Sequence, residues 1–536
     1  MSGTVWSAVA AHAERQPGAP AVSDSRNGRQ WSYAELVRDA EAAARSMAAL
    51  GIRRGETVAV FADNCVATAI IWLACARMGV AVSVINGLLI ARELASALSR
   101  ISARLLFVDA GHYDTAHAGV RWAGLNCLMY KVDDSDLNLL SWESLLRGPR
   151  VTGGADLALP AREDVIEVSF TSGTTSMSKG VVFDNGSYLF ATRTLVDHYR
   201  LTASDVVFTV CPLFHATGMR CGLAPGLVAG GHVVVAPGFH PRTFWPDAAR
   251  WKATFTALVD TMLIILLRQE PGEWEHKHSI WRIMGDLDLD HLDQAERRFG
   301  FRLYQMYGQT ESMAVLATPL SLRDEELDRA RRARPGANYV GLPLHPDIRI
   351  RLVDDGGRDV GESETGECLI RSPGLFTGYL GDPPGTRKAL RDGWLHTGDL
   401  CTRNDHGYYF VDRKKDMIRR GGENVASKEV EEVLESHPDI TEAAVIAERD
   451  AKYGQEVKAI VVPAPGRSIR PQDLWAWCAD HLADFKVPRY VEIRSRLPRN
   501  ATGKIVKARL KDEPPGTVHE VFDRLDAGPQ RARHQH

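Results

Sequence analysis

The chain has 536 residues, of which 44% are hydrophobic and 25% charged. These proportions are typical of globular proteins, and the length predicts about two to four domains. The formal net charge of −3 excludes a strongly basic protein, so we expect neither nucleic acid nor an anionic membrane as a partner. The eight cysteines are widely spaced without a CxxC pair, which favours reduced, mostly buried thiols over disulfides or a zinc site.

The N-terminal residues, MSGTVWSAVAAHAERQPG, lack the basic and apolar segments of a signal peptide. The longest apolar stretch starts at Ala67 and is interrupted by Arg77, Gly79 and Asn86. This pattern predicts a buried helix followed by a core strand rather than a membrane span. We therefore expect a cytoplasmic protein.

The first third of the chain alternates between helix and strand patterns. A helix is predicted over residues 33–50, where Ser32 and Glu35 form a capping box and Gly51 ends the periodic pattern. Short β-branched runs, typical of buried parallel strands in an α/β protein, follow at residues 57–62, 104–109, 205–210 and 231–236.

The composition changes near residue 412, where a charged, glycine-containing segment begins. Beyond it the patterns predict a helix at 428–437, strands at 441–448 and 455–464, and a helix that starts at Pro471. We predict an N-terminal body of residues 1–412, a hinge of residues 413–415 and a C-terminal domain of residues 416–536. A cleft between two domains is a common place for an active site.

Residues 169–183, SFTSGTTSMSKGVVF, have the composition of a phosphate-binding loop. Glycines allow backbone N–H groups to approach an anion, while the hydroxyls and Lys179 add donors and charge. A standard P-loop is disfavoured because Ser178 stands at its second glycine and Gly180 at its Mg²⁺-binding hydroxyl. On composition alone, an ordinary Ser/Thr/Gly surface loop is an alternative.

Five further motifs follow this loop in the chain. They are CPLFHATG at 211–218, YGQTES at 307–312, GWLHTGDL at 393–400, DRKKDMIRRGGENV from 412, and PRNATGK ending at Lys504. Together the six motifs resemble the adenylate-forming superfamily of acyl-CoA synthetases, firefly luciferase and peptide-synthetase adenylation domains, most closely the acyl- or aryl-CoA ligases. The resemblance covers essentially the whole chain. It implies an α/β fold with parallel sheets and a β-subdomain in a large N-terminal body, plus a small mobile α+β C-terminal domain.

The resemblance also implies a reaction. In that family a carboxylate attacks the α-phosphate of ATP, pyrophosphate leaves, and a thiol, usually coenzyme A, displaces AMP from the acyl-adenylate. Because two anions must meet, catalysis depends on positioning and on cationic or N–H groups near the phosphate oxygens. ATP, Mg²⁺ and coenzyme A are therefore the implied cofactors and co-substrates.

The resemblance implies that several residues of this sequence bind the nucleotide. Glu311 matches the Mg²⁺ ligand, since a hard carboxylate suits that ion, and Thr310 would donate to the α-phosphate. Tyr307 would lie against the adenine, while Asp399 and Arg413 would hold the ribose. The residues implied to wrap the β- and γ-phosphates are Thr171, Ser172, Gly173, Thr174, Thr175 and Lys179.

Other implied roles concern the acid, the thiol and the moving domain. Lys504 matches the C-terminal catalytic lysine, and His215 matches the residue that gates the acid site. Lys415 matches the hinge residue about which the small domain alternates between two poses. Gly421 and Gly422 would line the tunnel for the thiol.

Several positions depart from the family pattern. Ser176 and Ser178 stand where the phosphate loop usually has Gly and Pro. Asp286 lies within GDLD in place of a Gly-Ala-Ala-Pro-like turn, and Asp260 stands where proline is common. These two carboxylates either cap local backbone or bind an amino or hydrogen-bonding group of the substrate. The candidate pocket residues are Met219, Asp260, Leu263, Asp286, Met313 and Leu316.

The leading functional prediction is an ATP-dependent ligase that activates a small acid and transfers it to coenzyme A, working as a monomer or homodimer. One alternative changes the acceptor to an amine or a carrier protein supplied in trans, and another activates nitrite to diazotise an aryl amine. A non-catalytic nucleotide-binding relative is a third alternative, although intact Glu311, Asp399, Arg413 and Lys504 argue against it.

Overall fold

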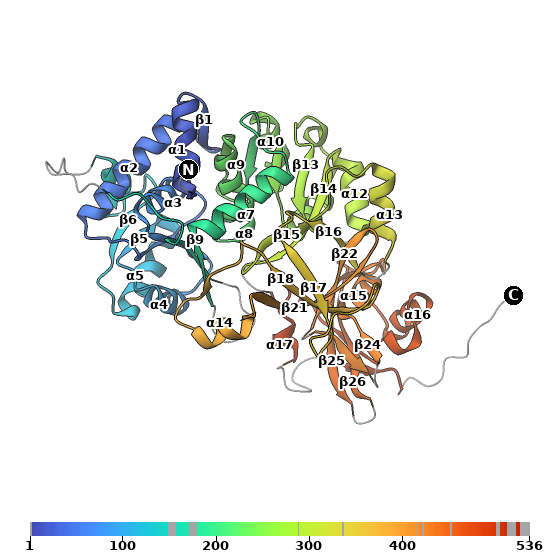
Figure 1. Ribbon diagram of the computed structural model, residues 1–536. Coiled ribbons are helices and arrows are strands. Elements are labelled where there is room, and N and C mark those ends of the chain that lie inside the picture. Colours follow the sequence, from blue (N-terminus) through green and yellow to red (C-terminus); the bar gives the residue numbers. More distant parts are fainter. Residues whose placement is uncertain are drawn as a thin grey trace.

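The computed structural model describes residues 3–147, 157–170, 179–287, 289–334, 337–414, 416–420, 423–450, 453–499, 504–511 and 521–525 (Figure 1). Residues 171–178 of the predicted phosphate loop, which include Ser176 and Ser178, lie outside this described part, as do the predicted hinge residue Lys415 and the glycines 421 and 422.

The first sheet contains eight strands and forms the N-terminal part of the body. Its central strands β3, β4 and β5 run parallel, as their continuous apolar sequences predict, and almost all of their residues are buried. In sheet order the strands are β19 (Gly378–Tyr379), β9 (Gly180–Asp184), β8 (Val165–Phe170), β4 (Ala81–Val84), β3 (Thr57–Phe61), β5 (Leu105–Val108), β6 (Leu128–Lys131) and β7 (Leu140–Ser141).

The second sheet contains fourteen strands, and near its centre the strand pairing changes from parallel to antiparallel. Strands β10 to β14 pair in parallel, and beyond β14 the pairing becomes antiparallel. In order the strands are β17 (Arg349–Val353), β18 (Gly366–Arg371), β21 (Trp394–Asn404) with β20 (Leu390–Arg391) beside it, β22 (Gly407–Arg413), β16 (Asn338–Pro343), β15 (Met313–Ala317), β14 (Arg302–Gln309), β13 (Arg282–Gly285), β12 (Phe255–Ala257), β10 (Val206–Thr209), β11 (His232–Val235), β1 (Pro20–Asp24) and β2 (Gln30–Ser32).

Helices cover these two sheets. The predicted first-third helix is α2 (Tyr33–Ala49), and its capping box forms, since Glu35 N donates to Ser32 Oγ at 3.3 Å and Ser32 N donates to Glu35 Oε2 at 2.9 Å. The predicted apolar helix is α3 (Val66–Met78), and every residue in it is buried. The others are α1 (Val5–Arg15), α4 (Ala91–Arg100), η1 (Ala110–His112), α5 (Tyr113–Ala123), α6 (Glu143–Leu146), α7 (Asn185–His198), α8 (Ala216–Gly218), η2 (Met219–Leu223), α9 (Ala224–Ala229), α10 (Phe244–Arg250), α11 (Asp260–Leu267), η3 (Glu273–His276), α12 (Leu289–Phe299), α13 (Asp324–Arg332) and α14 (Pro383–Ala389).

The C-terminal residues form a third, six-stranded sheet. A separate hydrophobic cluster, which includes Val430, Leu434, Val445 and Val457, makes its core. The elements are β23 (Ile418–Arg420), β24 (Glu423–Val425), α15 (Ser427–Glu435), β25 (Ile440–Asp450), β26 (Gly454–Pro463), α16 (Pro471–His481), η4 (Asp484–Lys486), β27 (Tyr490–Ile493), α17 (Lys507–Lys511) and β28 (Val521–Asp523). Figure 1 shows strands of this sheet below β17 and β21, with helices α15 and α16 to the right.

The predicted mixed α/β fold class, with a large body and a smaller C-terminal sheet, is therefore confirmed. All eight cysteines are free, and seven of them are buried. Among the described helices, none combines the length and apolar character that crossing a bilayer would require. The predicted domain boundaries stay a prediction; β22 ends at Arg413 and β23 begins at Ile418.

Burial holds several histidines of the body neutral, and His198 and His232 are two of them. Burial lowers the pKa of His198 and of His232 to about 4. His198 Nε2 donates to the carbonyl of Thr318 at 3.1 Å, and His232 Nε2 lies 2.8 Å from Ser23 Oγ. Because the unfolded value is 6.5, the unfolded chain binds more protons than the folded one between pH 6.5 and about 4. Stability is then present above pH 6.5 and is lost as the pH falls through this window.

We expect the free energy of unfolding to fall between pH 6.5 and 4, by on the order of 1–3 kcal/mol for each of these histidines. Urea denaturation across this range measures the slope, and His232→Gln should make it shallower. His240→Gln, at an exposed position, is the control and should leave the slope unchanged. An identical slope in the parent chain and in His232→Gln would contradict this explanation.

Candidate active site

A buried carboxylate lies where three strands meet. Asp399 on β21 is 1% exposed and faces Arg413 across the β21–β22 ladder. Its Oδ2 accepts hydrogen bonds from Tyr307 Oη at 2.9 Å and Gln309 Nε2 at 2.6 Å, both from β14. Arg413 Nε lies 2.9 Å from Oδ1. Burial raises the pKa of Asp399, while the Arg413 charge and the two hydrogen bonds oppose that rise.

The second carboxylate oxygen of Asp399 retains bonding capacity. Oδ1 is buried and accepts no hydrogen bond from the described residues, although the Arg413 guanidinium is within ion-pair distance. A buried acceptor without a donor is costly, so a ligand with hydroxyl groups would be favoured here. This geometry fits the ribose role predicted for Asp399 and Arg413. Gln309, which belongs to the YGQTES motif, was not predicted as a contact.

A second group lies beside the described end of the glycine-rich loop. Tyr379 Oη donates to Glu311 Oε1 at 2.7 Å, and Lys179 Nζ lies 4.2 Å from the centre of the Tyr379 ring. Strand pairing explains the contact, because Tyr379 on β19 is opposite Val181 on β9, two residues beyond Lys179. Burial, and then the Glu311 charge, raise the pKa of Tyr379, so its phenol keeps its proton. The structure thus brings Lys179 and Glu311 together, through a tyrosine that the sequence did not single out.

The turn between β14 and β15 carries Thr310. Arg220 holds this turn in place, because its Nη1 donates a hydrogen bond to the Thr310 carbonyl at 2.9 Å. Its Nε lies 3.1 Å from Glu167. Arg220 is 1% exposed and lies in η2, a π-helical turn of the kind often found at functional sites. A Cβ on Gly308 would lie 1.8 Å from the Met313 carbonyl, so only glycine fits there. Arg220 was missed, since an arginine in an apolar segment resembles ordinary helix sequence.

Three predicted acid-site residues follow the carboxyl ends of neighbouring parallel strands. His215 follows β10, Asp260 follows β12 and Asp286 follows β13. Ligands of parallel α/β sheets bind at this end of the strands. Burial lowers the pKa of His215 and raises that of Asp286, and the charge of Asp260 acts on both groups.

His215 is neutral in this environment. Burial, and then the charges of Lys504 and Arg220, lower its pKa to about 4. Its Nδ1 accepts a hydrogen bond from the backbone N–H of Thr217 at 3.2 Å, which places the ring proton on Nε2. The side chain can therefore donate one N–H bond to an anionic substrate near neutral pH.

Lys504, the predicted C-terminal catalytic lysine, acts on His215 and Asp286. The Lys504 charge lowers the pKa of His215 and opposes the rise that burial causes in Asp286. Burial raises the pKa of Asp286, and the charges of Lys428 and Lys504 oppose that rise. Gln305 Nε2 donates to its Oδ1 at 3.3 Å. The structure therefore gathers Lys504, His215, Asp260 and Asp286 at one end of the site.

The remaining predicted pocket residues are buried in the described structure. Leu263 is fully buried, and its Cδ1 would lie 3.4 Å from a Cβ added to Gly285, so it supports the wall that carries Asp286. Met313 has a φ of +56°, which an ordinary side chain rarely adopts. Met219 is 2% exposed and Leu316 is fully buried. Their role in lining the acid pocket stays a prediction.

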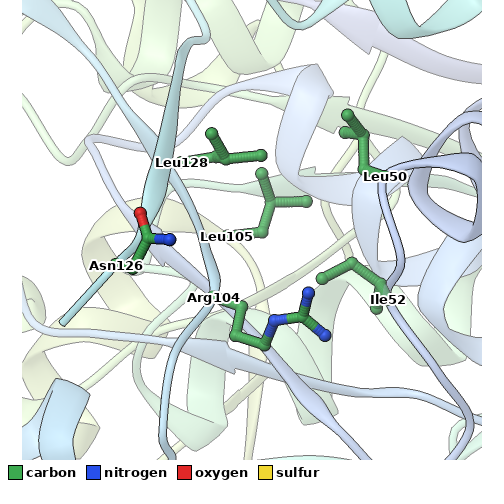
Figure 2. A pocket seen from close by; sticks show the side chains of 6 residues that line it. All are labelled: Leu50, Ile52, Arg104, Leu105, Asn126 and Leu128. Carbon is green, nitrogen blue, oxygen red and sulfur yellow. The ribbon is translucent and has the colours of Figure 1, made fainter.

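A small cavity of about 150 Å³ is lined by none of the site residues described above (Figure 2). It borders Leu105 and Leu128, the first residues of β5 and β6, at the amino ends of those strands. Because ligands of α/β sheets bind at the opposite ends, this cavity is not a candidate active site. Its walls are Leu50, Ile52, Arg104, Leu105, Asn126 and Leu128.

Comparisons with known proteins agree with the geometry. Residues 9–380 match the family described as AMP-binding enzyme, and residues 429–504 match the AMP-binding enzyme C-terminal domain. The chain is 33% identical to the crotonobetaine/carnitine–CoA ligase of Salmonella agona over 90% of this chain and 93% of that protein.

Solved structures also resemble this chain. ATP-bound MatB from Rhodopseudomonas palustris is 26% identical, with a TM-score of 0.84, over 96% of this chain and 99% of that chain. The amide bond synthetase McbA from Marinactinospora thermotolerans is 27% identical, with a TM-score of 0.81, over 94% and 99%.

The chain belongs to the AMP-binding enzyme family. The predicted resemblance to adenylate-forming enzymes is thereby confirmed. The predicted kind of enzyme, an ATP-dependent, AMP-forming ligase of the acyl-CoA synthetase type, is confirmed as well.

Replacing Tyr379 with Phe removes the hydrogen bond to Glu311 and keeps the ring beside Lys179. We expect the KM for Mg-ATP to rise about tenfold, because hydrogen bonds to charged groups contribute about 1.5–3 kcal/mol. Tyr379→Ala should raise it further, since the contact with Lys179 is also lost. ATP–pyrophosphate exchange measures both variants. Unchanged KM values would show that Tyr379 does not support the nucleotide site.

Replacing Lys504 with Ala should reduce adenylate formation by about 10²- to 10³-fold, because a charge near the reacting acid and phosphate is lost. Thioester formation from a supplied acyl-adenylate should be spared. Pyrophosphate exchange and thioester release measure the two half reactions separately. Equal loss in both would contradict a role confined to adenylation.

Proposed function

We propose that this enzyme activates a small carboxylic acid that carries a cationic ammonium group and transfers the acyl group to coenzyme A. The observation that carries the proposal is the pair of carboxylates, Asp260 and Asp286, at the acid end of the site. Crotonobetaine and carnitine, the acids in the name of the Salmonella agona relative, each combine a carboxylate with a quaternary ammonium group. That relative supports both the acid class and the thiol acceptor.

The charge balance of the acid end explains the preference. Lys504 and Lys428 both act on Asp286, so the cluster holds two cations near two carboxylates. When a substrate carboxylate binds to Lys504, the positive charge of Lys504 is shared, and the negative charge of Asp286 is less well balanced. A substrate cation restores the balance, and a partly desolvated carboxylate is a strong partner for such a cation.

The residues of this chain would divide the first half reaction among them. Asp399 and Arg413 would hold the ribose, and Lys179 would neutralise the β- and γ-phosphates. Neutral His215 would donate its Nε2–H to the acid, and Lys504 would hold the acid oxygen against the α-phosphate. The acid oxygen then forms a bond to the α-phosphorus while the bond to the pyrophosphate oxygen breaks.

A magnesium ion fits the phosphate end. Glu311 supplies hard carboxylate oxygens, the ligands that Mg²⁺ prefers, and the Tyr379 hydrogen bond to Oε1 orients them. The ion would neutralise phosphate charge when bound. The loop residues Thr171 to Thr175 complete the phosphate site in this proposal.

The second half reaction would require the C-terminal domain to turn. We propose that residues 416–536 turn about Lys415 relative to a body of residues 1–412, with residues 413–415 as the hinge. In the turned pose Lys504 leaves the acid end, and Gly421 and Gly422 line the path of the thiol. The thiolate sulfur then bonds to the acyl carbon, and AMP leaves with the oxygen.

ATP–pyrophosphate exchange across matched acids tests the proposal. The panel pairs each ammonium-bearing acid with a neutral isostere, and it adds aryl acids and nitrite. We expect exchange to be fastest with ammonium-bearing acids, and mass detection to show a coenzyme A thioester. Faster exchange with neutral acids or nitrite would refute the acid class, and product formed only with an added amine would refute the thiol acceptor.

Substituting Asp286 tests the cation contact directly. Asp286→Asn should raise the KM for an ammonium-bearing acid about tenfold, because a charge-assisted contact of about 1.5 kcal/mol is lost. The KM for the neutral isostere should stay the same or fall. Asp405→Asn, at an exposed turn, is the matched control. Equal changes in the KM for both acids would show that Asp286 does not determine substrate specificity.

A further inference from the structure

A buried polar network joins the two sides of the predicted hinge. Asp412, the residue before Arg413 on β22, is 4% exposed. Its Oδ2 accepts hydrogen bonds from Ser427 N at 2.7 Å and from Ser427 Oγ at 2.8 Å. Ser427 is fully buried and begins α15, whose preceding residue provides no side-chain cap. A carboxylate from the body therefore caps a helix of the C-terminal domain.

Lys507 completes the network from the element that follows the catalytic lysine. Its Nζ donates to Ser427 Oγ at 2.6 Å and lies 2.8 Å from Glu431 Oε1. Burial would lower the pKa of Lys507, but the charges of Glu431 and Asp412 outweigh it and raise that pKa. Lys507 is the first residue of α17 and lies three positions after Lys504. The network therefore connects the position of Lys504 to the last strand of the body.

We infer that Asp412, Ser427 and Lys507 form a lock that holds the C-terminal domain in the pose that places Lys504 beside His215 and Asp286. Asp412 precedes residue 415, whereas Ser427 and Lys507 follow it. A rotation about residue 415 would carry Ser427 away from Asp412 and break both of their hydrogen bonds. These three are positioning residues, and the inference rests on the proposed domain movement.

The lock should favour adenylate formation and oppose thioester formation. Adenylate formation needs Lys504 at the acid end, so it gains from the lock. Thioester formation needs the turned pose, so it must break the lock. Weakening the network should therefore slow the first half reaction without slowing the second. A network that only supported folding would affect both together.

The chain offers a matched control one helical turn along. Lys511 Nζ lies 2.9 Å from Asp416 Oδ1, and both of these residues follow residue 415. Lys511→Met removes the same charge from the same helix as Lys507→Met, but breaks a pair that does not cross the hinge. Asp412 is left unchanged, because its neighbour Arg413 lies in the nucleotide site.

The test compares Lys507→Met, Ser427→Ala and Lys511→Met in the full chain, with an acid that the parent enzyme activates. For the first two we expect pyrophosphate exchange to fall about tenfold, while thioester formation from supplied acyl-adenylate stays equal or rises. Lys511→Met should match the parent in both assays. Thermal unfolding of each variant reports on folding separately.

Equal loss of both half reactions in Lys507→Met and Ser427→Ala would overturn the lock, and so would unchanged exchange in both variants. Failure of the parent enzyme itself to exchange pyrophosphate with any acid would refute the proposed function instead. The two failures are therefore distinguishable.

Discussion

The burial of one carboxylate organises the nucleotide site. Asp399 is almost completely removed from water, and its charge must be balanced by groups from strands that are far apart in sequence. Tyr307 and Gln309 come from β14, and Arg413 comes from β22. The two bonds from β14 cross to β21 in the antiparallel half of the large sheet, so they fix that half relative to the parallel half, whereas Arg413 pairs with Asp399 across the neighbouring strand.

A cluster of ionisable side chains, which follow several strands, also forms where the acid substrate is proposed to bind. His215, Asp260 and Asp286 follow three adjacent parallel strands, so the sheet brings them together without local sequence contacts. Burial then makes His215 neutral, and it raises the pKa of Asp286 against the opposing charges of Lys428 and Lys504. In the proposed function, a substrate cation would join Lys504 and Lys428 as a partner of these carboxylates. Substrate preference and the position of the C-terminal residues would then be linked through electrostatics.

The C-terminal residues are connected to the body in two places. Lys504 enters the acid end directly, and Lys507 connects the same segment to Asp412 through Ser427. Hydrogen bonds to a buried carboxylate have defined geometry, so the proposed domain rotation would break them. A short polar network near the hinge can thus influence a reaction at a distance without touching the substrate.

The sequence by itself determined the family and the α/β class, and it predicted a nucleotide site that includes Tyr307, Asp399 and Arg413, which the fold brings together. Those signals are local: glycines and hydroxyls in one loop, capping residues, and motifs whose chemistry needs neighbouring side chains. Only the tertiary structure decided that Tyr379, Gln309 and Arg220 support the site, because each contacts a partner on another strand or turn. The meaning of the unusual Asp286 also depended on the tertiary structure, since a carboxylate's role follows from the charges and solvent around it, which a linear pattern does not specify.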